Sequence, residues 1–146
     1  MAGRFKVDEK IRLGKELIVA IREGKLEKAR ELINRGADIN TRGELKITPL
    51  MNAAAYGHTG IGQFLINRGA KIAARDEFDS EFSAPFGTAY RLAILKGHTD
   101  FLKMLETAMD NAMKGSANYH VGKLWKAACH NQRTKRQILE ILRTSN

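Results

Sequence analysis

The chain has 146 residues, of which 43% are hydrophobic and 28% charged, a composition typical of one folded globular domain. No apolar run approaches the roughly 18 residues that a membrane-spanning helix needs, and the one cysteine, Cys129, excludes an internal disulfide. With 25 basic and 16 acidic residues the formal net charge is +9, which either attracts nucleic acid, anionic membranes or acidic proteins or serves only to keep the protein soluble.

The first predicted element is a helix over about residues 8–23, in which Gly14 predicts an irregularity. A partner helix follows over residues 25–35. The pattern then returns at an offset of 33 residues, since the Asn-Arg-Gly-Ala run at 34–37 falls on the same four residues at 67–70. Such a period predicts stacked copies of one small structural unit, none of which can fold alone.

The second copy contains clear signals for where its two helices begin and end. Thr48 is a residue type that caps helices, and Pro49 suits the first helical turn because it has no N–H to leave unpaired. Gly57 predicts the end of the first helix, and a second helix is predicted over residues 59–67. The side chains expected to face inward are Leu50, Ala53, Ala54, Ile61, Phe64 and Leu65.

A third copy lies 40 residues after the second, because the Gly-His-Thr run at 57–59 recurs at 97–99. The excess over the 33-residue period indicates a seven-residue insertion between Ile72 and Thr88. The last helix of the third copy is expected to reach about Lys114. A fourth, degenerate copy follows, which we interpret as a cap. The predicted single domain, 1–146, therefore has units at about 8–40, 41–72, 73–106 and 107–146.

This order of residues at this period resembles the ankyrin repeat family. The resemblance depends on the runs at 48–50, 53–54, 57–58, 64–66 and 68–70, and it departs at Met51, where the family usually has histidine. The resemblance implies an all-α fold, an α-solenoid of stacked helix-turn-helix repeats with atypical caps. It also implies a non-catalytic module that binds a protein partner and needs no cofactor. We expect a monomer.

The resemblance also implies where such a partner would bind. The fingertip positions of the second unit are Glu44, Leu45 and Ile47, of which the last two are apolar where exposure is expected. A second set of positions lies just before the glycine that ends each first helix. These residues are expected to line up across the stack as Glu23, Tyr56, Lys96 and His130.

The insertion places phenylalanines four residues apart among acidic residues. One interpretation is a long loop that folds its own phenylalanines onto the stack. The other is a projecting finger that offers Phe78, Asp79 and Phe82 to a partner, since exposed aromatic side chains often dominate binding energies.

The basic end of the chain leaves a different function open. Arg133, Lys135, Arg136 and Arg143 crowd the last predicted helices, either as a solvated capping face or as a site for nucleic acid or another polyanion. Polyanion binding is the alternative to the protein-partner hypothesis, and it predicts an affinity that falls steeply with salt.

Motifs for catalysis, metal binding or phosphate binding are absent from the sequence. We interpret His58 and His98, which each follow a helix-ending glycine, as structural residues that bond nearby backbone. Cys129 and His130 are neighbours and would point in different directions on a helix, so they do not predict a catalytic pair. The first residues carry no apolar stretch. We therefore expect a cytoplasmic protein, or one in a host cytosol if it is a secreted effector.

Overall fold

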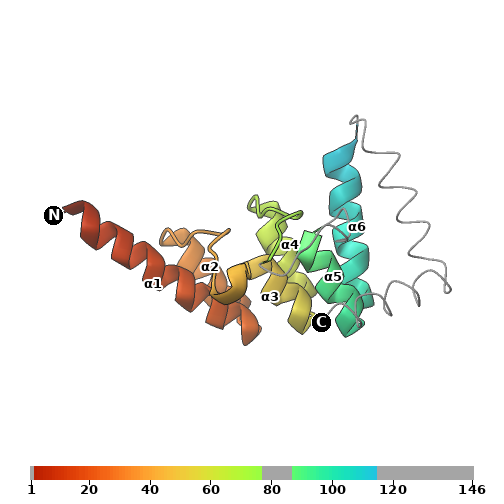
Figure 1. The fold of residues 1–146 in the computed structure, drawn as a ribbon, viewed down its shortest axis with the longest axis horizontal. Helices are drawn as coiled ribbons and strands as arrows, with labels where there is room; N and C mark the ends of the chain where they lie inside the picture. The colour runs from red at the N-terminus through yellow and green to blue at the C-terminus, as the bar shows by residue number, and fades with distance from the viewer. Residues whose placement is uncertain (1, 77–86, 115–146) are drawn as a thin grey trace. The chain divides into compact units, whose positions relative to one another are not determined.

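A computed structural model describes residues 2–76 and 87–114, and their regular structure is entirely helical (Figure 1). The chain forms two compact units, residues 1–104 and 105–146. The elements are α1 (Ala2–Arg22), α2 (Leu26–Asn34), the 3-10 turn η1 (Glu44–Lys46), α3 (Pro49–Tyr56), α4 (Thr59–Asn67), α5 (Gly87–Lys96) and α6 (Thr99–Met113).

The helices of the first unit pair and stack in chain order. α1 packs against α2 and α3 packs against α4, while α1, α3 and α5 form a row in which each helix packs against the next (Figure 1). Leu17, Leu50 and Ala53 are fully or almost fully buried in this row, and Ala93 occupies the same position in α5. This arrangement confirms the predicted α-solenoid of stacked helix pairs.

The predicted boundaries of α3 and α4 are confirmed by the cap geometry. The Thr48 hydroxyl accepts a hydrogen bond from the Met51 backbone N–H at 3.3 Å, and the Thr48 N–H donates to the Met51 sulfur at the same distance. Met51 thus completes the cap from the position where the family usually has histidine. Gly57 ends α3 with a left-handed φ of 72°, which costs a glycine little.

One histidine in each of two successive repeats bonds the backbone of the repeat before it. The Nε2 atom of His58 lies 3.3 Å from the carbonyl oxygen of Arg22, and the Nε2 atom of His98 lies 3.1 Å from that of Ala55. A carbonyl only accepts, so Nε2 carries the proton in both rings. The two bonds occupy equivalent positions in successive repeats, which confirms the structural role predicted for these histidines.

Helix α1 differs from its prediction in two ways. It begins at Ala2 rather than near residue 8, and it continues through Gly14 without the expected irregularity. The role of Gly14 is close packing, because a Cβ at this position would lie 2.6 Å from the Thr41 hydroxyl oxygen. The glycine therefore lets the segment after α2 approach α1.

Phe64 was predicted to face inward, and this is only partly correct. Its side chain is half-buried, and the guanidinium groups of Arg30 and Arg68 lie 5.1 and 5.3 Å from the ring centroid. Cation–π contacts of this kind stabilise an aromatic ring at a surface. Ile61 and Leu65, by contrast, are buried as predicted.

Close contact between α4 and α6 depends on Gly62. A Cβ at Gly62 would lie 2.5 Å from a ring carbon of Phe101 and 2.8 Å from the terminal carbon of Met104. Phe101 is fully buried, so its ring has little room to move. Gly60, two residues earlier on the same helix, has no atom within 4 Å of such a Cβ.

The predicted fingertip before α3 is a tight turn, and the described residues contain no β-strand that would make it a hairpin. The Gly43 N–H donates to the Ile47 carbonyl at 2.9 Å and closes the turn. Between them, Leu45 and Lys46 have φ angles of 56° and 59°. Residues other than glycine rarely adopt this left-handed backbone conformation, so the turn stores strain.

The two ends of the insertion are fastened to each other. The Asp76 N–H donates to the Thr88 hydroxyl at 2.9 Å, and the Thr88 N–H donates to the Ala74 carbonyl at 3.1 Å. The Arg91 guanidinium binds the Asp76 carboxylate at 2.7 Å, with side-chain exposures of only 17% and 4%. Residues 77–86 between these anchors lie outside the described part of the chain.

We expect Gly62→Ala to be less stable than Gly60→Ala. Both substitutions gain the same helix propensity, so their difference isolates the contact with Phe101, which should cost about 1–3 kcal/mol. Urea unfolding of the two variants measures this difference. Equal free energies of unfolding would contradict the close packing of α4 on α6.

We expect Lys46→Gly to raise the free energy of unfolding by about 1 kcal/mol, because glycine adopts the left-handed conformation without strain. Lys71→Gly is the matched control. Lys71 is an exposed loop lysine with an ordinary φ, so the change should lower stability by about 0.4–1 kcal/mol. If urea unfolding showed the same loss of stability in both variants, the backbone at Lys46 would not be strained.

Candidate functional site

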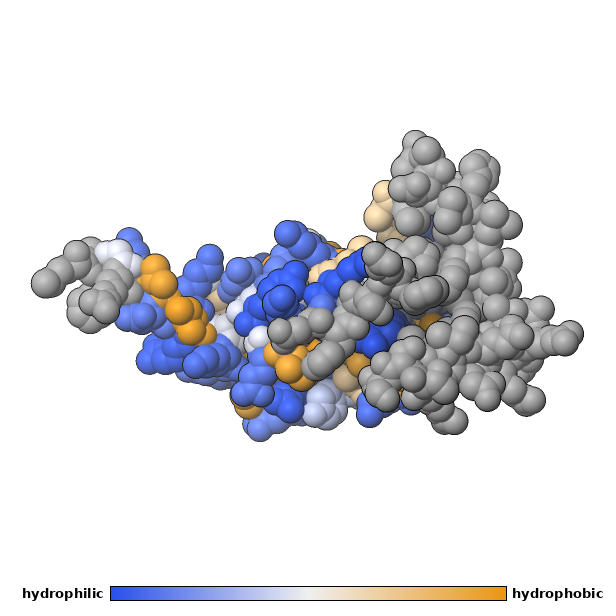
Figure 2. Space-filling model, viewed as in Figure 1, coloured by the Kyte–Doolittle hydropathy of each residue, from blue (hydrophilic) through white to orange (hydrophobic). Residues whose placement is uncertain are grey.

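Exposed hydrophobic side chains gather on one side of the first unit. Figure 2 shows them on α1 near its N-terminal end and over η1, on a face that is otherwise largely hydrophilic. Ile11, Val19 and Leu45 are 53%, 51% and 51% exposed. Scattered apolar residues are normal on a surface, but a cluster on neighbouring elements is typical of a binding site.

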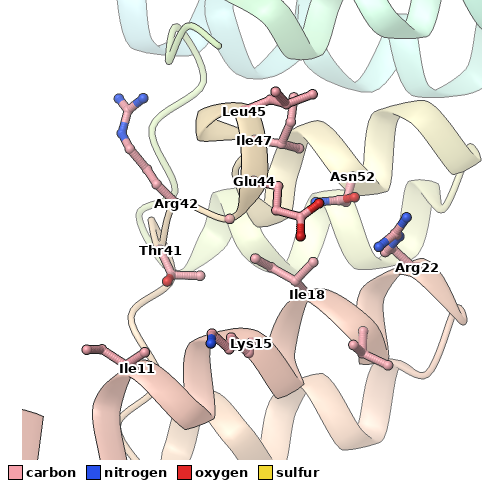
Figure 3. A pocket seen from close by; sticks show the side chains of 12 residues that line it. Ile11, Lys15, Ile18, Arg22, Thr41, Arg42, Glu44, Leu45, Ile47 and Asn52 are labelled. Atoms are coloured by element: carbon pink, nitrogen blue, oxygen red, sulfur yellow. The ribbon is translucent and has the colours of Figure 1, made fainter. Parts of the chain in front are cut away.

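These three side chains line one groove, with a volume of about 590 Å³, between α1 and the segment from Thr41 to Ile47. Figure 3 shows Ile11, Lys15 and Ile18 on the α1 side, opposite Thr41, Glu44 and Asn52. The complete lining is Ile11, Lys15, Ile18, Val19, Arg22, Thr41, Arg42, Gly43, Glu44, Leu45, Ile47 and Asn52.

Helix α1 supplies the floor of the groove because it carries two apolar faces. Leu13, Leu17 and Ile21 form the buried face, at the spacing of four that places residues on one side of a helix. Ile11 and Ile18 are separated by seven residues and lie on the adjoining side. A repeat helix that only packed in the stack would need just the first of these faces.

The charged side chains around this floor are mostly basic. Lys15, Arg22 and Arg42 line the groove together with one acidic residue, Glu44. The pKa of the Arg22 guanidinium is raised above its ordinary value, chiefly by a hydrogen bond with the Tyr56 side chain and less by the charge of Glu44. Guanidinium groups are charged at any ordinary pH, so three basic residues against one acidic residue give the groove net positive charge.

Tyr56 extends this surface along the end of α3. Its ring is stacked on the ring of His58 with an interplanar angle of 8° and a centroid distance of 6.1 Å. The side chain is nevertheless 49% exposed. An aromatic ring that is held in place but open to solvent can bind a partner at little cost in ordering entropy.

The structure brings together only some of the residues that the sequence singled out. Glu44, Leu45 and Ile47 line the groove, although Ile47 is half-buried rather than exposed. Tyr56 does not line the groove itself, but it interacts with Arg22, which does. Glu23 and Lys96 are exposed and do not line the groove. The remaining candidates lie outside the described residues: Phe78, Asp79, Phe82, His130, Arg133, Lys135, Arg136 and Arg143.

Sequence reasoning missed the contribution of α1. The sequence analysis assigned no role to Ile11, Ile18 and Val19, although their spacing indicates a second apolar face. Thr41, Arg42 and Asn52 carried no comparable signal, because their place in the groove depends on how the turn folds over α1.

Within residues 2–76 and 87–114, no group of three or more His, Cys, Asp or Glu side chains is arranged to hold a metal ion. Over the same ranges, no helix combines the length and apolar character needed to cross a membrane.

Comparisons with known proteins agree with the fold. The family model for ankyrin repeats (3 copies) matches residues 17–115. Over 89 residues the chain is 34% identical to the human ankyrin repeat and KH domain-containing protein 1, and 33% identical to ankyrin repeat and KH domain-containing protein mask of Drosophila melanogaster. These alignments cover 61% of this chain but only 3% and 2% of those proteins. Ankyrin repeats generally mediate protein–protein interactions. The helix pairs, the period and the family match together establish that this chain belongs to the ankyrin repeat family.

Proposed function

We propose that this chain is a non-catalytic module that binds a segment of a partner protein in the groove between α1 and residues 41–47. The observation that carries the proposal is the convergence of exposed apolar side chains there. Ile11, Val19 and Leu45 are each about half exposed and line one hollow of about 590 Å³. Burying such side chains against a partner supplies the free energy of binding.

The proposed mechanism is recognition by a rigid surface. Ile11 and Val19 are fixed by helix α1, and the turn that carries Leu45 is closed by the Gly43–Ile47 hydrogen bond. Because these positions are set by the stack, binding orders few additional groups. Strain at Leu45 supports the same interpretation, since strained backbone is often kept where a side chain must be presented.

Two further contact surfaces extend the proposal. The end-of-helix residues Tyr56 and Lys96 immediately precede Gly57 and Gly97, whose φ angles of 72° and 74° show that they occupy equivalent positions in their repeats. Glu23 precedes Gly24, with a φ of 73°, in the same way. The acidic and aromatic insertion is the second surface, held at its base by Asp76 and Thr88.

A photo-crosslinking amino acid at Val19 should capture a discrete protein from a cell lysate. The matched control is the same amino acid at Glu27, on α2, whose side chain is 83% exposed and does not line the groove. Mass spectrometry identifies the captured protein. Equal capture of the same protein from both positions would show that the groove is not the binding surface.

We expect Ile11→Asp to weaken binding of the captured protein about tenfold or more, because it puts a charge on the apolar floor of the groove. Leu95→Asp is the control, since Leu95 is 38% exposed and lies outside the groove. Isothermal titration calorimetry measures both affinities, and circular dichroism verifies the fold. Similar losses in both variants would argue against a groove-specific role for Ile11.

A further inference from the structure

The basic side chains of the described surface fall into two groups. Five of those outside the groove form ion pairs with acids: Arg12 with Glu16, Lys25 with Glu23, Lys28 and Arg35 with Glu31, and Arg30 with Glu27. None of the three basic residues that line the groove takes part in such an ion pair within the described residues.

The groove therefore keeps its positive charge. Arg42 donates to a neutral acceptor, the Arg75 carbonyl, at 3.0 Å. The Tyr56 side chain raises the pKa of the Arg22 guanidinium more than the charge of Glu44 does. Lys15 has no acidic group within 4 Å among the residues that the structure describes. Three basic residues against one acidic residue, Glu44, leave an excess of positive charge around the apolar floor, which favours a partner of the opposite sign.

The shape of the apolar floor indicates the secondary structure of the partner. Ile11 and Ile18 lie seven residues apart on α1, a distance of about 10 Å or two helical turns, and the exposed Val7 lies one turn beyond the groove. A peptide that binds by strand addition needs an exposed strand edge, and the described residues contain no strand. A polyproline-type peptide binds grooves lined by aromatic residues, and no aromatic residue lines this groove. A helix satisfies its own backbone and can lay one apolar face along such a floor.

We propose that the groove binds an acidic amphipathic helix of a partner protein, with its apolar side chains on Ile11, Ile18 and Val19 and its carboxylates facing Lys15 and Arg22. This inference rests on the proposed function of the groove and names the partner's chemistry. Single-stranded nucleic acid fits less well, because no aromatic residue lines the groove to stack against bases.

The test uses the 146-residue chain and three fluorescein-labelled probes. The first is a peptide of about 16 residues with leucines three and four residues apart and glutamate on the remaining face. The second replaces every glutamate with lysine, and a third, single-stranded DNA of similar length, represents polyanions. Fluorescence anisotropy at low and high salt should show binding of the glutamate peptide alone, and a central proline in that peptide should abolish it.

Two charge-reversal variants on α1 sharpen the test. Lys15→Glu should lower the affinity for the glutamate peptide about tenfold at low salt and less at high salt, since screening weakens surface charges. Arg12→Glu changes the net charge equally from outside the groove, so its effect should stay within about twofold. Ile11→Asp should also abolish binding of this peptide.

Several outcomes would overturn the inference. They are no binding of the glutamate peptide, equal binding of the lysine peptide, tighter binding of the DNA, or equal effects of Lys15→Glu and Arg12→Glu. The proposed function fails separately, if crosslinking from Val19 is no more selective than crosslinking from Glu27. If Val19 crosslinks a partner protein but the glutamate peptide does not bind, the proposed function stands and the proposed class of partner, an acidic amphipathic helix, is wrong.

Discussion

A pair of short helices has too little apolar surface to fold alone, so every other feature of this chain depends on how one pair fits the next. The histidine bonds show how the fit is achieved. His58 and His98 each bond a backbone carbonyl in the last turn of the preceding repeat's first helix. Carbonyls there have no partner within their own helix, so each bond satisfies a group that the stack would otherwise leave unpaired.

The same stacking creates the groove. The row formed by α1, α3 and α5 fixes one wall, and the turn that precedes α3 is held over α1 by the room that Gly14 leaves for Thr41. Apolar side chains such as Ile11 and Val19 are then left open to solvent on a rigid helix. Stability and recognition thus use different faces of α1, and a substitution on one face can leave the other intact.

Most of the fold was predictable from the sequence because it is encoded locally. Thr48, Pro49 and Gly57 mark helix ends by properties of single residues, and the period of 33 implied the stack. The half-exposure of Phe64 was not predictable, since it depends on Arg30 from α2 and on Arg68, which follows α4. The groove was predicted only at Glu44, Leu45 and Ile47, because the role of Ile11 depends on which segment crosses α1.

The fastened base of the insertion bears on how this repeat can change over evolutionary time. Asp76 and Thr88 hold the two ends of the intervening segment at a fixed separation, and Arg91 anchors Asp76 to α5. The entropic cost of closing a loop grows only with the logarithm of its length, about 0.6 kcal/mol for each doubling. Residues can therefore be gained, lost or exchanged between these anchors while the helices keep their register, which makes this position a natural place for the repeat to acquire new sequence.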